Sequence, residues 1–294
     1  MPSSLITVFT ALAAFQAPID SLDARVRARI ALVPGAEVAV AYRQLHRAGA
    51  LYVNADTSFH AASTMKVPIM IELFRRADAG ALSLDQPVLL VNQFGSIVDG
   101  SPYALDPKDD SDSSVYRRLG TRVPVRELME HMIVRSSNLA TNSVIALVGA
   151  DRAEATMRAL GASRIRVLRG VEDGKAFERG LNNTTTARDL SIILAAIADD
   201  RAASAASCAA MRDILLRQEF NEQIPAGLPP GTKVAHKTGS ITAHLHDAAI
   251  VYPGAGDPYV LVVLTRRIPD ENIASALIAD ISRLVYEHAQ AKNQ

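Results

Sequence analysis

The chain has 294 residues, enough for one large domain or for two interleaved ones. Its 31 lysine and arginine residues balance its 31 aspartate and glutamate residues, so the formal net charge is zero. Nucleic acids and anionic membranes both select a basic surface, and this balance argues against either as the main partner. Cys208 is the only cysteine, so no internal disulfide can form.

Near the N-terminus, residues 5–17 form an apolar stretch that is too short to span a bilayer. Such a stretch is typical of the hydrophobic part of a secretory signal, here ending near Ala17. No lysine or arginine precedes it, however, and Phe15 fits a small-residue cleavage site poorly. We expect residues 1–17 to be a signal segment, with a frayed chain start as the alternative, and no other segment to insert stably in a membrane.

The first part of the chain predicts a surface helix, two strands joined by a turn, and a strongly apolar helix. These elements cover residues 20–33, 37–45, 50–59 and 63–79. The next segment differs in composition, because Gly, Ser, Pro and Asp dominate residues 94–121. That composition predicts a long excursion on the surface.

Helical spacing recurs through the middle of the chain, and strands return before a final amphipathic helix. The middle helices are predicted at residues 125–134, 139–148, 152–160, 186–198 and 206–218. The late strands are predicted at residues 232–238, 247–252 and 259–266, and the final helix at residues 271–290.

Two early and three late strands, adjacent through hairpins, indicate one five-stranded antiparallel sheet flanked by the terminal helices. The predicted fold class is therefore α/β plus an all-α lobe, with the helical domain inserted between the strands. We expect residues 18–63 and 221–294 to form the α/β lobe and residues 64–220 the helical lobe. A cleft would lie between the two lobes.

Ser63 and Lys66 stand three residues apart at the front of the predicted apolar helix. At this spacing the two side chains share one helix face, where a lysine can hold, polarise or deprotonate a serine. The alternative is a serine that caps the helix, followed by a solvated lysine. Because the helix is so apolar, we expect Lys66 to be partly buried, and a desolvated lysine can release its proton.

Ser136 and Asn138 cannot share one helix face at a spacing of two residues, so we expect them on a loop or at a helix start. There Ser137 can cap the following helix while Ser136 projects away from it. A third motif lies on a predicted strand that borders the cleft, and it reads Lys237-Thr238-Gly239.

These three motifs in this order are typical of class A β-lactamases and penicillin-binding proteins. From about residue 20 to the C-terminus, the chain resembles that family, including the residues around each motif. The matching runs are Ser63-Thr64-Met65-Lys66-Val67-Pro68, Ser136-Ser137-Asn138-Leu139-Ala140-Thr141-Asn142, Thr184-Thr185-Thr186 and His236-Lys237-Thr238-Gly239-Ser240. The resemblance implies a serine β-lactamase-like fold.

The resemblance also implies catalytic roles. Ser63 would be the nucleophile, assisted by Lys66, or by Glu172 through a water molecule. Ser136 would pass a proton to the departing nitrogen. For the substrate, the resemblance implies that Asn138 binds an amide and that Lys237 and Thr238 bind a carboxylate. Gly239 would let the substrate backbone lie close. The N–H groups of Ser63 and Ser240 would form an oxyanion hole, and Ser240 could add a contact to the substrate.

The base for deacylation has two candidates, both glutamates on the same predicted loop. Glu172 lies 36 residues after Ser136, a spacing that suits the family. Glu178 fits the family's Glu-x-x-Leu-Asn wording better but leaves almost no loop before Thr184. We favour Glu172 as the base, with Glu178 as the first alternative. The second alternative is that neither is the base and Glu172 is a solvated carboxylate on the loop. The loop is shorter and more diverged than is usual in the family.

A zinc site is a competing interpretation, because His244 and His246 share one strand face and His236 lies nearby. No third ligand falls at a recognisable spacing, so we expect no metal and no cofactor. By resemblance, His246 stands where the family often places a cation that steers the substrate carboxylate, a weak role for a neutral imidazole. Tyr103 and Tyr116 would either wall the cleft or pack locally.

The leading hypothesis is a serine β-lactamase that hydrolyses the lactam amide through an acyl-enzyme on Ser63 and so gives antibiotic resistance. One alternative is a D-alanyl-D-alanine peptidase or esterase-type penicillin-binding hydrolase with slow deacylation. Another is a non-hydrolytic penicillin-binding sensor. The expected partner is a small β-lactam or a D-Ala-terminated peptide. We expect a monomer in the periplasm or secreted, with a cytoplasmic location as the alternative.

Overall fold

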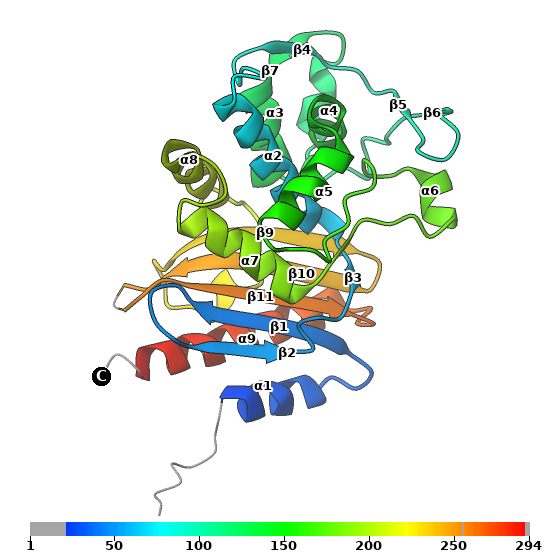
Figure 1. Ribbon diagram of the computed structural model, residues 1–294. Coiled ribbons are helices and arrows are strands. Elements are labelled where there is room, and N and C mark those ends of the chain that lie inside the picture. Colours follow the sequence, from blue (N-terminus) through cyan, green and yellow to red (C-terminus); the bar gives the residue numbers. More distant parts are fainter. Residues whose placement is uncertain (1–21, 255, 292–294) are drawn as a thin grey trace, which may run out of the picture.

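A five-stranded antiparallel sheet forms the lower half of the molecule in Figure 1. The structure is a computed structural model, and it describes residues 22–254 and 256–291. The strand order is β2-β1-β11-β10-β9. The strands are β1 (Glu37–Gln44), β2 (Ala50–Val53), β9 (Lys233–Ile241), β10 (His244–Tyr252) and β11 (Tyr259–Arg266). The predicted sheet is therefore confirmed, and the N-terminal strands join the C-terminal ones through the pairing of β1 with β11.

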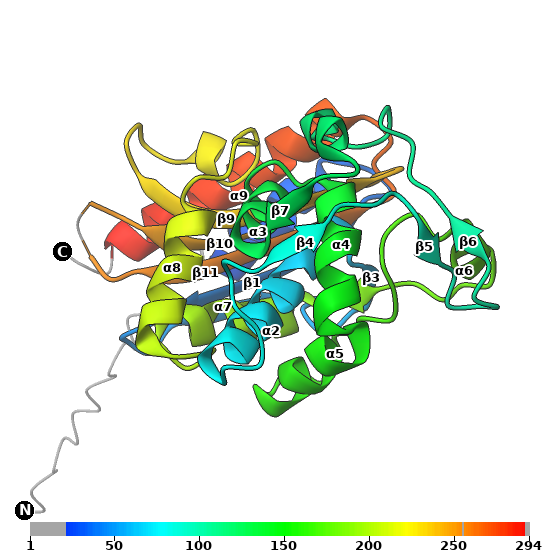
Figure 2. The same cartoon turned by 90° about the horizontal axis from the view of Figure 1, so that it is seen from above.

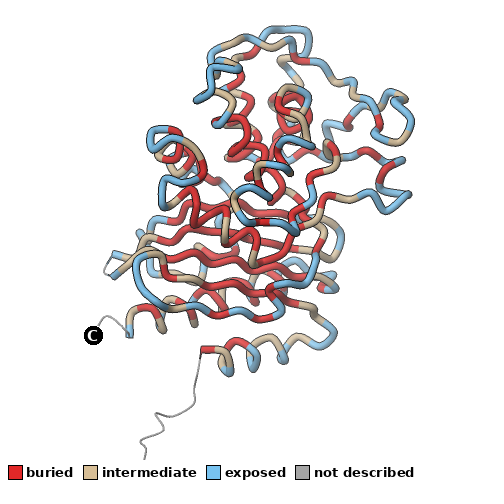
Figure 3. Tube along the Cα trace, in the orientation of Figure 1, coloured by how far each residue is buried: buried red, intermediate tan, exposed pale blue. Residues whose placement is uncertain are grey.

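Strand alternation divides the core into two layers, because successive side chains point to opposite faces of the sheet. On β1, Val38, Val40 and Tyr42 face one layer, while Ala39 and Ala41 face the other. The first layer is closed by two terminal helices, α1 (Leu22–Ala31) and α9 (Glu271–Ala291), which lie beneath the sheet in Figure 1. Strands β1, β9, β10 and β11 are buried along most of their length, as Figure 3 shows, whereas the residues of the edge strand β2 alternate between exposed and buried.

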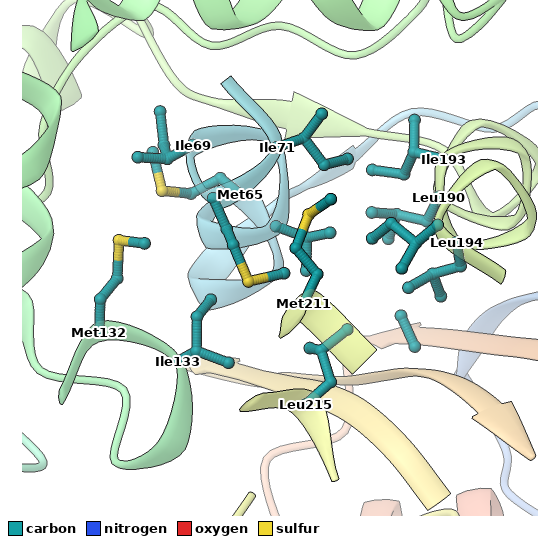
Figure 4. Close-up of a cluster of buried hydrophobic side chains, with 14 of the residues drawn as sticks. Met65, Ile69, Ile71, Met132, Ile133, Leu190, Ile193, Leu194, Met211 and Leu215 are labelled. Carbon is teal, nitrogen blue, oxygen red and sulfur yellow. The ribbon is translucent and has the colours of Figure 1, made fainter. Parts of the chain in front are cut away.

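The opposite face of the sheet carries the remaining helices, which lie above it in Figures 1 and 2. They are α2 (Lys66–Asp78), α3 (Val125–Val134), α4 (Asn138–Val148), α5 (Ala150–Ala159), α7 (Ala187–Ala198) and α8 (Ala205–Leu215). Side chains of α2, α3, α7 and α8 interdigitate in a core that includes Met65, Met132, Leu194 and Met211 (Figure 4). Although α7 belongs to residues 64–220, it packs directly against the sheet.

Most predicted elements have bounds within a few residues of those in the structure, and two differ in kind. The strand expected over residues 50–59 ends at Val53, because Asn54 adopts a left-handed backbone with φ 48° and starts a turn. A separate short strand, β3 (Phe59–His60), then pairs with β8 (Thr184–Thr185). The predicted helix over residues 63–79 begins as a 3-10 turn, η1 (Ala62–Met65), before α2.

The acidic excursion over residues 94–121 contains short ordered elements. They are β5 (Phe94–Gly95), β6 (Pro102–Tyr103) and the 3-10 helix η2 (Ser113–Arg118), and the segment is framed by the paired strands β4 (Pro87–Leu89) and β7 (Arg122–Pro124). Two further short elements occur later in the chain, α6 (Gly174–Glu178) and η3 (Pro225–Gly227). No helix among residues 22–254 and 256–291 is long and apolar enough to cross a membrane, and the expected signal segment lies outside these residues.

Candidate active site

Ser63 lies in η1, where the chain enters α2. Ala62 just before it adopts φ 45°, and its N–H donates to His60 Nδ1 at 3.0 Å. This strained residue directs Ser63 outward, so Ser63 is partly exposed while its neighbours Ala62 and Thr64 are buried. The turn also lies against β9, since a Cβ on Gly239 would stand only 3.0 Å from the backbone nitrogen of Ser63.

Lys66 is fully buried one turn later, at the start of α2. Its Nζ donates to the carbonyl of Ser136 at 2.6 Å, to Ser136 Oγ at 3.1 Å and to Asn138 Oδ1 at 2.9 Å. Burial lowers the pKa of Lys66 to about 7, and the carboxyls of Asp110 and Glu172 partly oppose that shift. A lysine with such a pKa exchanges its proton near neutral pH.

The Ser136 hydroxyl lies between two buried ammonium groups. Lys66 Nζ is 3.1 Å from Ser136 Oγ, and Lys237 Nζ is 3.0 Å from it. Ser136 has φ 58°, and Ser137 caps α4 by accepting from the N–H of Ala140. The backbone therefore turns Ser136 away from the helix that Ser137 starts, as the sequence predicts.

Lys237 comes from β9 and is fully buried. Its Nζ also donates to the carbonyl of Thr238 at 2.9 Å. Burial and the neighbouring Lys66 ammonium hold the pKa of Lys237 well below its usual range, while Asp247 opposes them. Farther along β9, Ser240 is exposed, and its hydroxyl donates to Glu271 Oε1 at 2.9 Å.

Asn138 connects this cluster to Glu172. Its Oδ1 accepts from Lys66, and its Nδ2 donates to Glu172 Oε1 at 2.6 Å. Partial desolvation raises the pKa of Glu172, although the residue as a whole is exposed. The nearby carboxyls of Asp110 and Asp109 act in the same direction, whereas the Asn138 amide and the Lys66 ammonium oppose it.

Asn142, one turn along α4 from Asn138, holds the loop that carries Glu172. Its Oδ1 accepts from the N–H of Val171 at 2.7 Å, and its Nδ2 donates to the carbonyl of Val171 at 3.0 Å. The loop approaches so closely that a Cβ on Gly170 would stand 2.5 Å from Asn142 Oδ1. Glu172 itself adopts φ 60°, so its carboxylate is directed by a backbone that the loop must hold in place.

The two glutamates are placed differently. Glu172 reaches Asn138, whereas Glu178 lies exposed in α6. The α6 helix begins after the Glu172 turn, with Asp173 as its N-cap. The structure thus brings together Ser63, Lys66, Ser136, Asn138, Glu172, Lys237, Thr238 and Gly239, with Ser240 farther along the same strand.

His246 is fully buried, with both ring nitrogens engaged. The N–H of Thr265 donates to Nδ1 at 3.2 Å, so Nε2 carries the proton and donates to the carbonyl of His60 at 2.9 Å. Burial lowers the pKa of His246 to about 4, so the ring is neutral at physiological pH. Within the described residues, no group of three or more histidine, cysteine, aspartate or glutamate side chains is arranged to hold a metal ion.

Sequence reasoning missed the parts of the site that hold the catalytic segments together. Composition places Asp110 and Tyr103 in a surface excursion, yet Asp110 accepts hydrogen bonds at the start of α4 and Tyr103 donates to the carbonyl of Val171. Asn142 stands out in the sequence only as part of a matching run. A single sequence carries no signal for such contacts, because their partners are distant in the chain.

Solved structures with a similar fold cover nearly the whole chain. PBP-A is 26% identical with a TM-score of 0.79, covering 93% of this chain and 97% of its own, and a mutant of PBP-A was solved as an acyl-enzyme complex with penicillin-G. A β-lactamase from Chitinophaga pinensis is 26% identical with a TM-score of 0.80, covering 91% of this chain and 99% of its own. The fold is therefore that of the serine β-lactamases.

Sequence comparison gives the same family. The model of the β-lactamase enzyme family matches residues 21–289, and the chain belongs to this family. The β-lactamase AST-1 of Nocardia asteroides is 28% identical over 79% of this chain and 73% of its own length. A β-lactamase of Bacillus licheniformis is 29% identical over 58% of this chain, and the match spans 57% of that relative.

Proposed function

We propose that this protein is a serine β-lactamase, which opens the lactam amide through a covalent acyl-enzyme on Ser63. The observation that carries the proposal is the hydrogen-bonded chain from Lys237 through Ser136, Lys66 and Asn138 to Glu172. Its central member, Lys66, stands one helical turn from Ser63, and its last member is a carboxylate. The groups that would move protons in acylation and deacylation are thus connected.

In the acylation step, Ser63 Oγ attacks the lactam carbonyl and loses its proton to Lys66, or to Glu172 through a water molecule. The low pKa of Lys66 supports the first route, because a neutral amine can accept the proton. The N–H groups of Ser63 and Ser240 would stabilise the oxyanion. When the C–N bond breaks, the nitrogen takes its proton from Ser136 Oγ.

The position of Ser136 suits that proton transfer. Its hydroxyl lies 3.1 Å from Lys66 Nζ and 3.0 Å from Lys237 Nζ, so either nitrogen can replace the proton that the hydroxyl gives up. The proton removed from Ser63 by Lys66 can therefore reach the leaving nitrogen without entering solvent.

For substrate binding, Lys237, Thr238 and Ser240 would contact the carboxylate next to the lactam nitrogen, and Asn138 would contact an amide. Gly239 would let the substrate backbone lie close to β9. The lack of a Cβ there also lets β9 pack against the Ser63 turn. No cofactor or metal takes part in this scheme.

In the deacylation step, Glu172 would remove a proton from water, which attacks the ester carbonyl and returns Ser63 to its free form. A carboxyl with a raised pKa is a stronger base than an ordinary glutamate, and its contact with Asn138 supports this assignment over Glu178.

We further propose the division into an α/β lobe of residues 18–63 and 221–294 and a helical lobe of residues 64–220. A periplasmic or secreted monomer that gives antibiotic resistance fits the family. The similarity to PBP-A favours one second candidate, a penicillin-binding hydrolase or D-alanyl-D-alanine peptidase that acylates in the same way and deacylates slowly.

One experiment tests both candidates. The protein is mixed with a chromogenic cephalosporin, and both turnover and the intact mass are followed. Sustained turnover supports the β-lactamase, and a persistent adduct on Ser63 supports the second candidate. If the protein shows no turnover and forms no adduct, both candidates are refuted. The variant Ser63→Ala should lose both signals, whereas Ser163→Ala, at an exposed serine, should keep them.

A further inference from the structure

The acidic excursion over residues 94–121 touches both segments that carry catalytic groups. On one side, Ser96 Oγ and the N–H of Ile97 donate to the Asp173 carboxylate at 2.8 and 2.9 Å, next to Glu172. In Figures 1 and 2, β5 and β6 accordingly lie beside α6. On the other side, Asp110 reaches the start of α4. The segment therefore bridges the start of α4 and the Glu172 loop.

Asp110 is buried and accepts three hydrogen bonds at the start of α4. Its Oδ2 accepts from the N–H of Asn138 at 2.9 Å, from the N–H of Leu139 at 2.9 Å and from Ser137 Oγ at 3.3 Å. The first N–H groups of a helix have no partner within the helix, and a carboxylate at this end is favoured by the helix dipole. Asp110 thus accepts from the first two N–H groups of α4, while Ser137 Oγ accepts from the third.

The backbone that Asp110 anchors is that of Asn138, whose side chain contacts both Lys66 and Glu172. Asn138 accepts from Lys66 through Oδ1 and donates to Glu172 through Nδ2. A shift of the Asn138 backbone would alter both contacts together. A misplacement of about 1 Å at a catalytic group can reduce a rate by about 10²-fold.

We propose that Asp110 is a positioning residue for the reaction: from the acidic excursion, its carboxylate fixes the start of α4 and sets the charge environment of Lys66 and Glu172. The proposal rests on the proposed function only for its kinetic consequences. The excursion over residues 94–121 would then support the arrangement of the catalytic residues rather than only cover the surface.

The negative charge of Asp110 shifts the pKa of Lys66 and the pKa of Glu172 in the same direction. Asp110 raises the pKa of Lys66 and also raises that of Glu172. The other charged groups that face Lys66 are Glu172 and Lys237, and those that face Glu172 are Asp109 and Lys66. Removal of the Asp110 charge should therefore move both titrations to lower pH, whichever group accepts the proton from Ser63.

Two tyrosines complete the titratable surroundings of Glu172. Tyr103 in β6 and Tyr116 in η2 both interact electrostatically with this carboxylate. Burial raises the pKa of both phenols above its usual value, so both stay neutral where Lys66 and Glu172 titrate. They therefore do not obscure the shift expected at these two groups.

The test uses Asp110→Asn, with Asp112→Asn as the matched control. Asp112 is a buried carboxylate of the same excursion, but it caps η2 and contacts His131 rather than α4. The pH profile of acylation should shift to lower pH in Asp110→Asn, with a rate loss of about 10- to 100-fold. Asp112→Asn should leave the profile in place.

A second measurement is independent of activity. With only six lysines in the chain, the Lys66 side chain can be titrated by NMR in protein labelled at lysine Cε. The Lys66 midpoint should fall in Asp110→Asn and stay in Asp112→Asn. An unchanged midpoint would overturn the proposal even if the protein proved to have another activity. Conversely, a shifted midpoint in a protein without turnover or adduct would refute only the proposed function.

If Asp110→Asn does not fold, as judged by circular dichroism, Asp110→Glu keeps the charge but displaces the carboxylate. Positioning predicts about a 10-fold or greater loss of acylation with the pH profile retained. Wild-type rates in Asp110→Glu would refute the role of Asp110 in positioning Asn138.

Discussion

Asn138 Nδ2 donates a hydrogen bond of 2.6 Å to Glu172 Oε1, which ties the loop glutamate to the start of α4. The same amide accepts from Lys66 through its oxygen, so one side chain orients the groups proposed for both half-reactions. Because a primary amide both donates and accepts, it can satisfy an ammonium and a carboxylate at once. A change at Asn138 is therefore expected to affect acylation and deacylation together.

The first prediction concerns Glu172→Gln. Loss of the base should leave acylation of Ser63 largely intact and slow deacylation by about 10²- to 10⁴-fold, because general-base catalysis contributes in that range. The acyl-enzyme should then accumulate in the intact mass spectrum. The matched variant Glu178→Gln should turn over normally, since Glu178 lies exposed in α6. If the acyl-enzyme accumulates in Glu178→Gln instead, Glu178 is the base for deacylation.

The second prediction is the pH dependence of acylation. If Lys66 accepts the proton from Ser63, the amine must be neutral, so kcat/KM should rise with pH and level off above a midpoint near its pKa of about 7. The burst of acylation in Glu172→Gln should keep this rise, with its midpoint moved to lower pH because the Glu172 carboxyl raises the pKa of Lys66. Disappearance of this midpoint in Glu172→Gln would assign the proton transfer to the glutamate and its water.

The third prediction concerns stability. In the folded protein the pKa of Lys66 is lowered from its unfolded value of 10.5 to about 7, so between these pH values the unfolded chain binds more protons. Stability should therefore rise with pH across this range, by at most about 1.4 kcal/mol per pH unit from one such group. Urea unfolding at pH 7 and pH 9 measures this rise.

Among the described residues, Lys237 is the one other group whose large pKa shift acts between pH 7 and pH 9. The pKa values of His60 and His246 are lowered to about 4, so they act below pH 7, and that of Tyr42 is raised to about 12, so it acts above pH 9. Lys237 contributes with the same sign as Lys66. In Lys66→Met the rise should shrink, and an unchanged slope would show that Lys66 titrates normally.

The fourth prediction is Gly170→Ala. The added Cβ would stand 2.5 Å from Asn142 Oδ1, so either the loop moves away from α4 or the Asn142 side chain gives up its hydrogen bonds to Val171. Both changes loosen the loop that carries Glu172. Deacylation should slow by at least about 10-fold, because small displacements of a base are costly. Acylation should change little. Gly174→Ala is the control, since no atom lies within 4 Å of its added Cβ. Equal effects of both variants on deacylation would contradict this picture.

The fold and the three motifs could be predicted because they depend on local pattern. Strand alternation on β1 and β11 predicts two buried faces. The three-residue spacing of Ser63 and Lys66 places them one turn apart where η1 leads into α2. The turn at Ser136 followed from helix geometry and from the preference of Ser137 for an N-cap. The prediction missed the early end of β2, although Asn54 and Asp56 are residue types that favour turns and Asn tolerates a left-handed backbone.

The contacts that join the catalytic segments could not be predicted from one sequence. Asp110 meets Asn138 across 28 residues, and Asn142 meets Val171 across 29. Composition places an Asp-rich segment at the surface, because aspartate is mostly solvated, and it cannot single out the carboxylate that is buried against the start of α4. Such a residue is identified only when the backbone donors around it are known.

The fifth prediction is Gly239→Ala. Its Cβ would stand 3.0 Å from the backbone nitrogen of Ser63 and 3.1 Å from that of Thr64, closer than such atoms normally approach. Either β9 or the η1 turn must shift, which would disturb the nucleophile and the N–H proposed for the oxyanion. Because the loss of one oxyanion donor costs about 10²- to 10³-fold in rate, a partial displacement should slow acylation by about 10-fold or more.

The rate at which the adduct forms on Ser63 measures this effect. Gly254→Ala is the control, because no atom lies within 4 Å of its added Cβ. Normal acylation in Gly239→Ala would show that the substrate site does not depend on the close packing of these two segments.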